Sequence, residues 1–135
     1  MKLRIAVAMF ALGLAGLVMP MAAHHSVPGT YDIDVTIKLR GVVTKVEWRN
    51  PHARVWMDSR NEDGSVSSWQ LELPGPNALR QKNVNLDFVK QGDQITVDLW
   101  RAKDGTRLAH ALTMAIPDGR VLSFPRNWGM PESSK

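Results

Sequence analysis

The chain has 135 residues, with 17 lysines and arginines against 13 aspartates and glutamates, and it contains no cysteine. This length fits one small domain with a single core. A chain without cysteine has no disulfides and no thiolate chemistry, so its stability must come from the core, and a soft-metal site would need histidine or methionine.

The first segment of the chain predicts a cleavable export signal. Lys2 and Arg4 form a short basic region, Ile5 to Val18 is an uncharged apolar run, and Ala22-Ala23 offers small residues to a signal peptidase. The run of about 14 residues is shorter than the roughly 18 to 20 that a membrane span needs. We therefore expect residues 1–23 to be removed, leaving a periplasmic or secreted protein without a stable membrane anchor.

Removal of the leader also changes the charge of the protein. Loss of Lys2 and Arg4 lowers the formal net charge from +4 to +2. Such a weak positive excess argues against nucleic acid as a partner, because domains that bind nucleic acid usually carry a marked basic patch. The remaining candidate partners are a small molecule, a metal ion or a periplasmic protein.

The mature chain divides into three parts. We expect an extended segment over residues 24–34, a folded domain over residues 35–125 and a flexible tail over residues 126–135. Short alternating strands separated by turn signals fill the domain, and the one helical stretch begins with Asn77 as its cap.

The first strand of the domain contains the strongest indication of its architecture. Its apolar phase slips between Val43 and Val46, close to Gly41, which predicts a bulge or bend in one long strand. The full order is long bent strand, strand, strand, helix, strand, strand, as in an OB-fold barrel. We therefore predict an all-β, OB-fold-like small barrel with one short helix, and an open sandwich is the alternative.

The alternation of apolar and polar residues along each strand also predicts which aromatic and histidine side chains face the core and which face solvent. Trp48 and Trp69 fall on the core side, whereas Trp56 and Trp100 fall on the polar side and are candidates for an exposed stacking surface. His110 shares a phase with its apolar neighbours in the fifth strand, namely Leu108, Leu112, Met114 and Ile116. We interpret it as a core or barrel-end histidine with a backbone hydrogen-bond partner.

Short motifs spread over nearly the whole mature chain form a recognisable set. They are His24-His25-Ser26, Gly41-Val42-Val43-Thr44-Lys45-Val46-Glu47-Trp48, Asn50-Pro51-His52, Pro76-Asn77, Gly92-Asp93, Arg101-Ala102-Lys103-Asp104-Gly105 and Pro117-Asp118-Gly119-Arg120. Together they resemble a family of small exported bacterial proteins, domain of unknown function 6152. The resemblance implies export and this fold, and it supplies no reaction. The chain departs from the usual family pattern at Val27, where an aromatic residue is common, and at His110, where a small polar residue such as Asn is expected.

Two loops are candidates for a ligand site, because OB-folds usually bind through the middle strands and the loops after strands one and four. Trp48 and Trp56 offer aromatic surface beside the first loop, and Trp100 does so beside the second. The polar candidates are Arg49, Asn50 and His52 in the first loop, with Arg101, Lys103 and Asp104 in the second. The alternative for the first loop is purely structural, with Asn50-Pro51 setting a turn and His52 beginning the next strand.

The predicted new amino terminus is a candidate metal site. Cleavage after Ala23 would free the amine of His24 to chelate copper together with its own imidazole, with His25 or His52 adding another nitrogen. Cleavage after Ala22 would instead leave a terminus whose amine, backbone nitrogens and His25 imidazole suit square-planar copper or nickel. The alternative is a solvated leader remnant that binds metal incidentally.

The sequence contains no recognisable catalytic constellation: it lacks a nucleophile elbow, a His-Glu-x-x-His helix and a phosphate loop. We therefore expect a non-enzymatic periplasmic binding module. The main alternative is a copper protein, either a carrier or a redox enzyme, that uses His24, His25 and His52.

Overall fold

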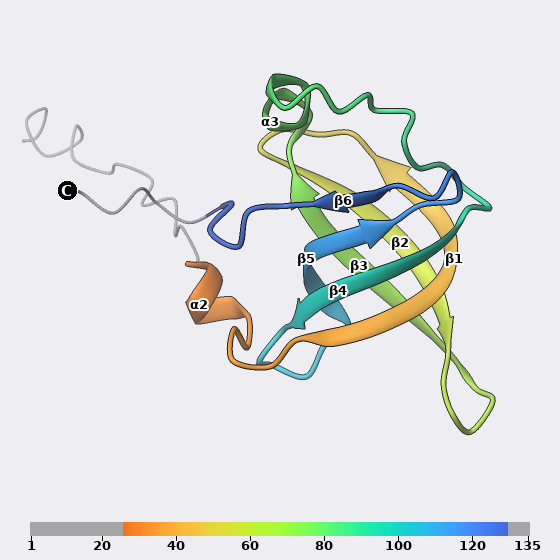
Figure 1. The fold of residues 1–135 in the computed structure, drawn as a ribbon. Helices are drawn as coiled ribbons and strands as arrows, with labels where there is room; N and C mark the ends of the chain where they lie inside the picture. Colours follow the sequence, from red (N-terminus) through yellow and green to blue (C-terminus); the bar gives the residue numbers. More distant parts are fainter. Residues whose placement is uncertain (1–25, 130–135) are drawn as a thin grey trace, which may run out of the picture.

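The computed structural model describes residues 26–129. Within these residues the chain forms six strands and two short helices, whose arrangement is drawn in Figure 1. In chain order the elements are α2 (Val27–Thr30), β1 (Ile37–Glu47), β2 (His52–Arg60), β3 (Val66–Pro74), α3 (Pro76–Gln81), β4 (Gln94–Arg101), β5 (Leu108–Ala115) and β6 (Val121–Ser123).

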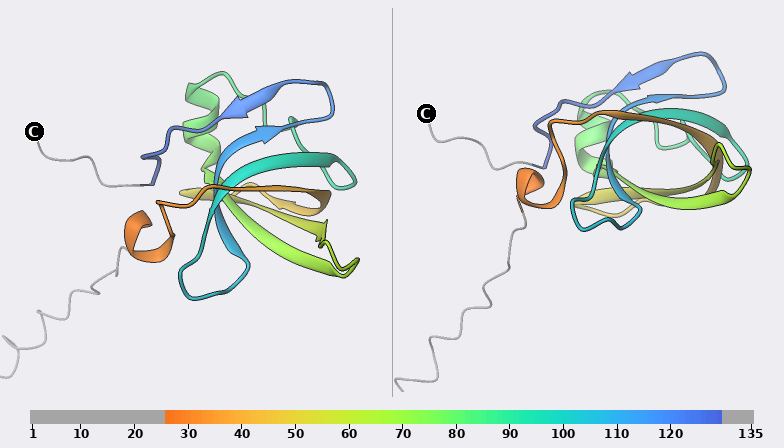
Figure 2. Two further views of the ribbon diagram at one scale, coloured as in Figure 1. Left: turned by 60° about the horizontal axis from the view of Figure 1, so that its bottom comes forward. Right: turned by 90° about the horizontal axis from the view of Figure 1, so that it is seen from below.

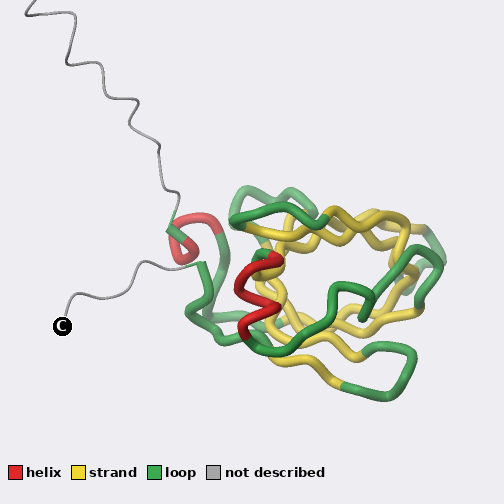
Figure 3. The backbone as a smooth tube through the Cα atoms, turned by 90° about the horizontal axis from the view of Figure 1, so that it is seen from above, coloured by secondary structure: helices red, strands yellow, loops and turns green. Residues whose placement is uncertain are grey.

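The strands form a closed barrel. Their order is β3-β2-β1-β4-β5-β6, and a parallel pairing of β3 with β5 closes the ring. Five strands therefore form the barrel, and β6 pairs with β5 outside the ring. The ring is visible end-on in the right view of Figure 2 and in Figure 3, where α3 lies at one side of it. The predicted OB-fold-like barrel is confirmed.

The bend in β1 allows the sheet to close. The pairing register of β1 with β2 shifts between Val43 and Lys45. This shift is the bulge that the change of apolar phase between Val43 and Val46 predicts. Just before it, Gly41 pairs with Ser59 on one side and with Ile95 on the other. A Cβ at Gly41 would overlap the Asp58 carbonyl oxygen and lie 2.9 Å from its carbon, so only glycine lets the strands approach this closely.

The barrel interior is filled by the apolar phases of the strands. Trp69, Leu71 and Leu73 of β3 point inward and are buried, as predicted, whereas Trp48 is only partly buried against the core. Phe88 and Val89 are buried in the same core together with Leu79 of α3. The cap of α3 differs from the prediction: Gly75 precedes Pro76 at the N-cap, and Asn77 lies inside the helix.

A bulge in β5 splits what looks like a single apolar phase. Asp98 of β4 pairs with Thr113, but the next residue, Leu99, pairs with Ala111, which leaves Leu112 as an extra residue. Met114 and Ile116 therefore belong to the barrel core, whereas Leu112 belongs to a second cluster. The prediction of one continuous inward phase through His110 is wrong, because the bulge reverses the phase.

The second cluster lies outside the barrel wall. It joins Trp100 and Ala102 of β4 and Leu112 of β5 to Val27 and Tyr31 from the chain before β1. Figure 2 shows α2 beside the C-terminal end of the described chain, outside the ring. The segments at both ends of the domain thus cover one outer face of the barrel.

These covering segments differ from the extended arm and flexible tail that we predict from the sequence. Val27–Thr30 is a helical turn capped by the Ser26 hydroxyl, which accepts a hydrogen bond from the Gly29 amide. Residues 125–129, the C-terminal strap, return to the barrel, where the Trp128 indole donates to the Ala111 carbonyl over 2.9 Å. Apolar side chains within both segments account for the difference, because docking buries them.

Candidate functional site

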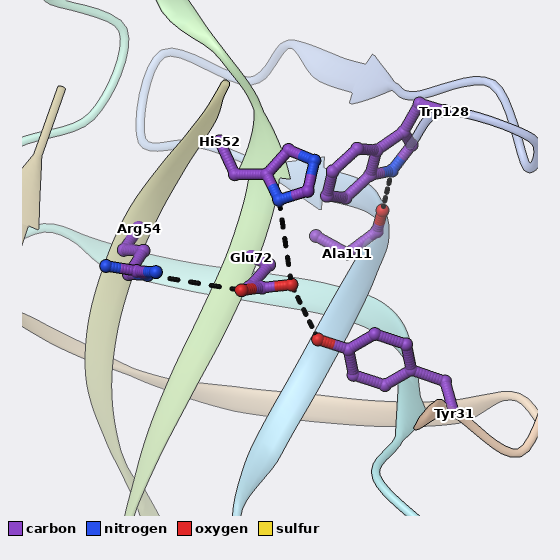
Figure 4. A network of polar contacts seen from close by, with 6 residues as sticks. All are labelled: Tyr31, His52, Arg54, Glu72, Ala111 and Trp128. Carbon is purple, nitrogen blue, oxygen red and sulfur yellow. Dashed lines mark hydrogen bonds and ion pairs between the residues drawn. The ribbon is translucent and has the colours of Figure 1, made fainter. Parts of the chain in front are cut away.

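A carboxylate on the outer face of β3 is the centre of a polar cluster. Glu72 accepts a hydrogen bond of 2.7 Å from the Tyr31 hydroxyl, as Figure 4 shows. Burial and this hydrogen bond to a carboxylate both raise the pKa of Tyr31 above its ordinary value. The phenol therefore stays protonated and holds Glu72 in place from the side of the N-terminal segment.

Two side chains of β2 face the same carboxylate. His52 places Nδ1 4.0 Å from one Glu72 oxygen, and Arg54 places Nε 4.0 Å from the other. The Arg54 Nε atom is buried and has no hydrogen-bond partner among residues 26–129, so its nearby counter-charge is Glu72. With Nδ1 turned toward Glu72, the Nε2 atom of His52 faces the opposite direction, toward the C-terminal strap.

Aromatic rings lie next to this polar cluster and form a stack. The His110 imidazole stacks with Trp128, at 3.9 Å between ring centroids, and with Trp100, at 5.4 Å, and both ring pairs are close to parallel. His52 packs edge-on against Trp128, with the two ring centroids 5.2 Å apart. Trp128 therefore contacts both histidines.

His110 is almost completely buried, with 1% of its surface exposed. Burial, with a smaller contribution from nearby His52, lowers its pKa to about 4. The predicted burial is confirmed, although its position is on the outer wall beneath the two covering segments. Its Nε2 atom has no hydrogen-bond partner within the described chain.

The N-terminal segment docks close to His52. Lys103 fixes it twice, through its Nζ atom to the Pro28 carbonyl at 2.8 Å and through its amide to the Thr30 carbonyl at 2.9 Å. A Cβ at Gly129 would lie 3.4 Å from His52 Nε2 and 3.6 Å from Val27 Cγ2, so the free imidazole nitrogen and the docked segment flank the same residue. The N-terminal segment, which the structure describes from Ser26 onward, therefore docks near His52.

The predicted metal ligands are only partly visible. His24 and His25 lie outside the described residues, and His52 lies at the start of β2. Within residues 26–129 no group of three or more histidine, aspartate or glutamate side chains is arranged to hold a metal ion.

The loop between β1 and β2 has a structural role at Asn50. Its Oδ1 atom accepts a hydrogen bond from the Asn77 amide over 3.2 Å, which ties the loop to the start of α3. A Cβ at Gly75 would overlap the Pro51 carbonyl oxygen, so the loop packs directly on the end of β3. Trp48 packs edge-on against Phe88, and Arg49 is exposed.

The hairpin between β4 and β5 borders a shallow pocket. Arg101 donates to the Gly105 carbonyl at 3.0 Å, and Asp104 accepts from Thr106, so both residues also stabilise the turn. The pocket has a volume of about 390 Å³. Its lining residues are Asp32, Val35, Ile37, Arg101, Ala102, Lys103 and Gly105.

The structure does not bring the two predicted ligand loops together. In Figure 1 the β1–β2 loop lies near α3 at the top of the barrel, and the β4–β5 hairpin lies at the bottom. Trp56 is on the outer wall, where the Lys45 ammonium lies 4.6 Å from its ring centre. Trp100 is buried, so the prediction of an exposed stacking surface is wrong for this residue: the covering segments hide its polar-phase face.

Sequence reasoning missed four members of the cluster, namely Tyr31, Arg54, Glu72 and Trp128. Alternation places Arg54 and Glu72 on the outward faces of their strands, but outward polar residues usually only face solvent. Tyr31 offered a faint indication, because it is the one tyrosine of the chain and precedes the first strand. Nothing local marks Trp128 as a partner of β5.

Residues 26–129 contain no helix that is both long and apolar enough to cross a membrane.

Comparison with curated proteins gave no match. Among solved structures, the mitochondrial single-stranded-DNA-binding protein of S. cerevisiae is similar over 62% of this chain and 93% of its own, with 9% sequence identity and a TM-score of 0.47. The model of the family of unknown function DUF6152 matches residues 11–111. This match covers more than half of the chain and most of the barrel described above, so the chain belongs to the DUF6152 family.

Proposed function

We propose that this protein is an exported, non-enzymatic binding module whose ligand is copper(II), held by the processed amino terminus together with His52. The observation that carries the proposal is the orientation of His52. Its Nδ1 atom faces Glu72, and its Nε2 atom faces Gly129 of the strap, beside which Val27 of the docked N-terminal segment also lies.

The surroundings of His52 suit a metal ligand. Histidine ligands commonly direct their second ring nitrogen at a carboxylate, which fixes the ring and raises its basicity. Glu72 can play that part, because the Tyr31 hydroxyl holds it at 2.7 Å and Arg54 lies on its other side. The 4.0 Å between His52 and Glu72 is longer than a hydrogen bond, so we expect the two to approach when metal binds.

The distance to the terminus also supports the proposal. His24 and His25 immediately precede Ser26, and Val27 is anchored beside Gly129 and His52. Each residue of extended chain spans roughly 3.3 to 3.6 Å. His25 lies two residues before Val27, so its side chain can reach a metal bound at Nε2 of His52. A free amine and imidazole nitrogens form a donor set that copper(II) prefers among common divalent ions.

A second candidate ligand is a small molecule bound at the β4–β5 hairpin. The pocket beside Arg101 and Lys103 has a volume of about 390 Å³, within the usual range for small-molecule sites. Because the β1–β2 loop lies at the other end of the barrel, this site would work without Asn50 or His52. The weak charge of the mature chain still argues against nucleic acid.

The first test establishes export and the terminus together. Protein recovered from the periplasm should have lost about 22 or 23 residues by intact-mass analysis. Recovery of the full-length chain in the inner membrane would remove both the export proposal and the free terminal amine.

The second test addresses copper. Correctly processed protein should bind copper(II) more than about tenfold more tightly than an isolated peptide of residues 24–34, which is 1.4 kcal/mol or more. His52→Ala should remove this advantage, whereas Asn50→Ala, in a loop residue that contacts α3, should keep it. Equal affinity for protein, peptide and His52→Ala would show that the terminus binds copper without help from the fold.

A further inference from the structure

We propose that the C-terminal strap, residues 125–129, is a gate that controls access to the Nε2 atom of His52. The inference extends the proposed function, because a gate at this position would set the rate of metal entry and release. The gate itself can be tested without metal, through the reactivity of the imidazole.

The end of the strap lies directly over the free nitrogen. A Cβ at Gly129 would be 3.4 Å from His52 Nε2, and the Trp128 ring packs edge-on against the imidazole. The same Cβ position lies 3.6 Å from Val27 Cγ2, so Gly129 borders both the His52 nitrogen and the N-terminal segment. The strap thus covers the His52 nitrogen at the place where the N-terminal segment docks.

Trp128 provides most of the attachment of the strap to the barrel. Its indole stacks on His110 at 3.9 Å and donates to the Ala111 carbonyl at 2.9 Å. Its backbone amide bonds only within the strap, to the Pro125 carbonyl. Arg126 adds a looser contact, with its guanidinium 5.7 Å from the Trp100 ring centre. One side chain therefore decides whether the strap stays closed.

The surface beneath the strap is built independently of it. His110 also stacks on Trp100 and tilts against Tyr31, and Tyr31 is fixed by Glu72. Phe124, at the base of the strap, is buried and bonds through its amide to the Leu112 carbonyl at 2.8 Å. Opening can therefore pivot after Phe124, leaving the barrel and His52 in place while Trp128 leaves its position.

Trp128→Ala in the full processed chain tests the gate through carbethoxylation of His52 by diethyl pyrocarbonate, followed by peptide mass spectrometry. We expect His52 to react about tenfold faster in this variant than in the wild type, which corresponds to 1.4 kcal/mol of closure. Trp128→Phe keeps an aromatic ring on His110 but loses the indole N–H, so an intermediate rate is expected.

Arg126→Ala is the matched control within the strap, because it leaves both Trp128 contacts in place. Its His52 rate should stay close to that of the wild type. Thermal unfolding of each variant will confirm that the barrel remains folded at the temperature of the assay. An unchanged His52 rate in Trp128→Ala, or an equal increase in Arg126→Ala, would overturn the assignment of Trp128 as the residue that closes the gate.

Copper exchange separates the gate from the proposed function. If both are right, release of copper(II) to an excess of chelator should also be about tenfold faster in Trp128→Ala than in the wild type. Faster carbethoxylation without any copper binding would support the gate and overturn the copper proposal. If copper binds at His52 but carbethoxylation and copper release are equally fast in both proteins, the copper proposal would be supported and the gate overturned.

Discussion

The imidazole of His110 lies flat against the indole of Trp128, with ring centroids 3.9 Å apart and planes within 10° of parallel. Trp100 is also nearly parallel to this imidazole, with ring centroids 5.4 Å apart, and almost none of His110 meets solvent. This position favours the neutral ring and lowers the pKa of His110 to about 4 from its ordinary 6.5. Stability of the covered face is therefore linked to pH.

The first prediction concerns this linkage in metal-free protein. Between pH 6.5 and about 4 the unfolded chain binds a proton at His110 that the folded protein does not, so the unfolding free energy should fall with falling pH. Below about pH 4 both states are protonated and this contribution becomes constant. His110→Phe removes the titrating group while keeping a ring between the tryptophans.

Melting temperatures of the wild type and His110→Phe, measured from about pH 7 to about pH 4.5, will check it. Titration of the carboxylates changes the melting temperature of both proteins alike. The difference between the two curves therefore reports the contribution of His110. The wild type should lose stability more steeply than the variant, and parallel curves would contradict a depressed pKa.

The second prediction concerns the bend in β1. Gly41→Val should lower the unfolding free energy by about 3 kcal/mol or more, because its Cβ would overlap the backbone of Asp58. Urea denaturation measures the change. Gly64→Ala in the β2–β3 turn, where nothing lies near the added Cβ, should cost only about 1 kcal/mol of backbone strain. A neutral Gly41→Val would be incompatible with this close approach of strands.

The third prediction concerns the support of His52. Glu72→Gln should weaken copper(II) binding by about 10- to 100-fold, since it removes the charge that faces the imidazole. Tyr31→Phe should cost about 1 kcal/mol of stability by removing the hydrogen bond to Glu72. Isothermal titration and urea denaturation measure the two effects. Unchanged copper affinity in Glu72→Gln would show that the carboxylate does not support a metal ligand.

The fourth prediction separates the loop from the site. Asn50→Ala should lower the unfolding free energy by about 1 kcal/mol, because the Asn77 amide loses its acceptor. Copper affinity should be unaltered, since His52 keeps its contacts with Glu72 and the strap. A loss of ligand binding at full stability would instead return Asn50 to the ligand site that its sequence context predicts.

Much of the barrel could be predicted because its signals are local. Alternation of apolar and polar residues has a period of two in any strand, and the slip between Val43 and Val46 marks the bulge without knowledge of the partner strands. The inward side of Trp69 follows from the same alternation. Where a second bulge reverses the phase, at Leu112, the reasoning fails, because no glycine or turn residue marks it.

The candidate site could be predicted only in part. His52 stands out in a loop crowded with functional residue types, but its orientation depends on Glu72, which looks like an ordinary outward residue of β3. Trp100 falls correctly on the face opposite the barrel core, and its burial depends on segments distant in the chain.

The sequence by itself determined the order of the strands, the bend in the first of them and the family to which the chain belongs. Only the tertiary structure decided that Tyr31 meets Glu72, 41 residues away, and that Trp128 stacks on His110. The physical reason is that strand patterns arise from neighbours along the chain, whereas these contacts form only after closure of the barrel creates an outer wall. The terminal segments then bury their apolar side chains on that wall, and no local pattern records which part of it they cover.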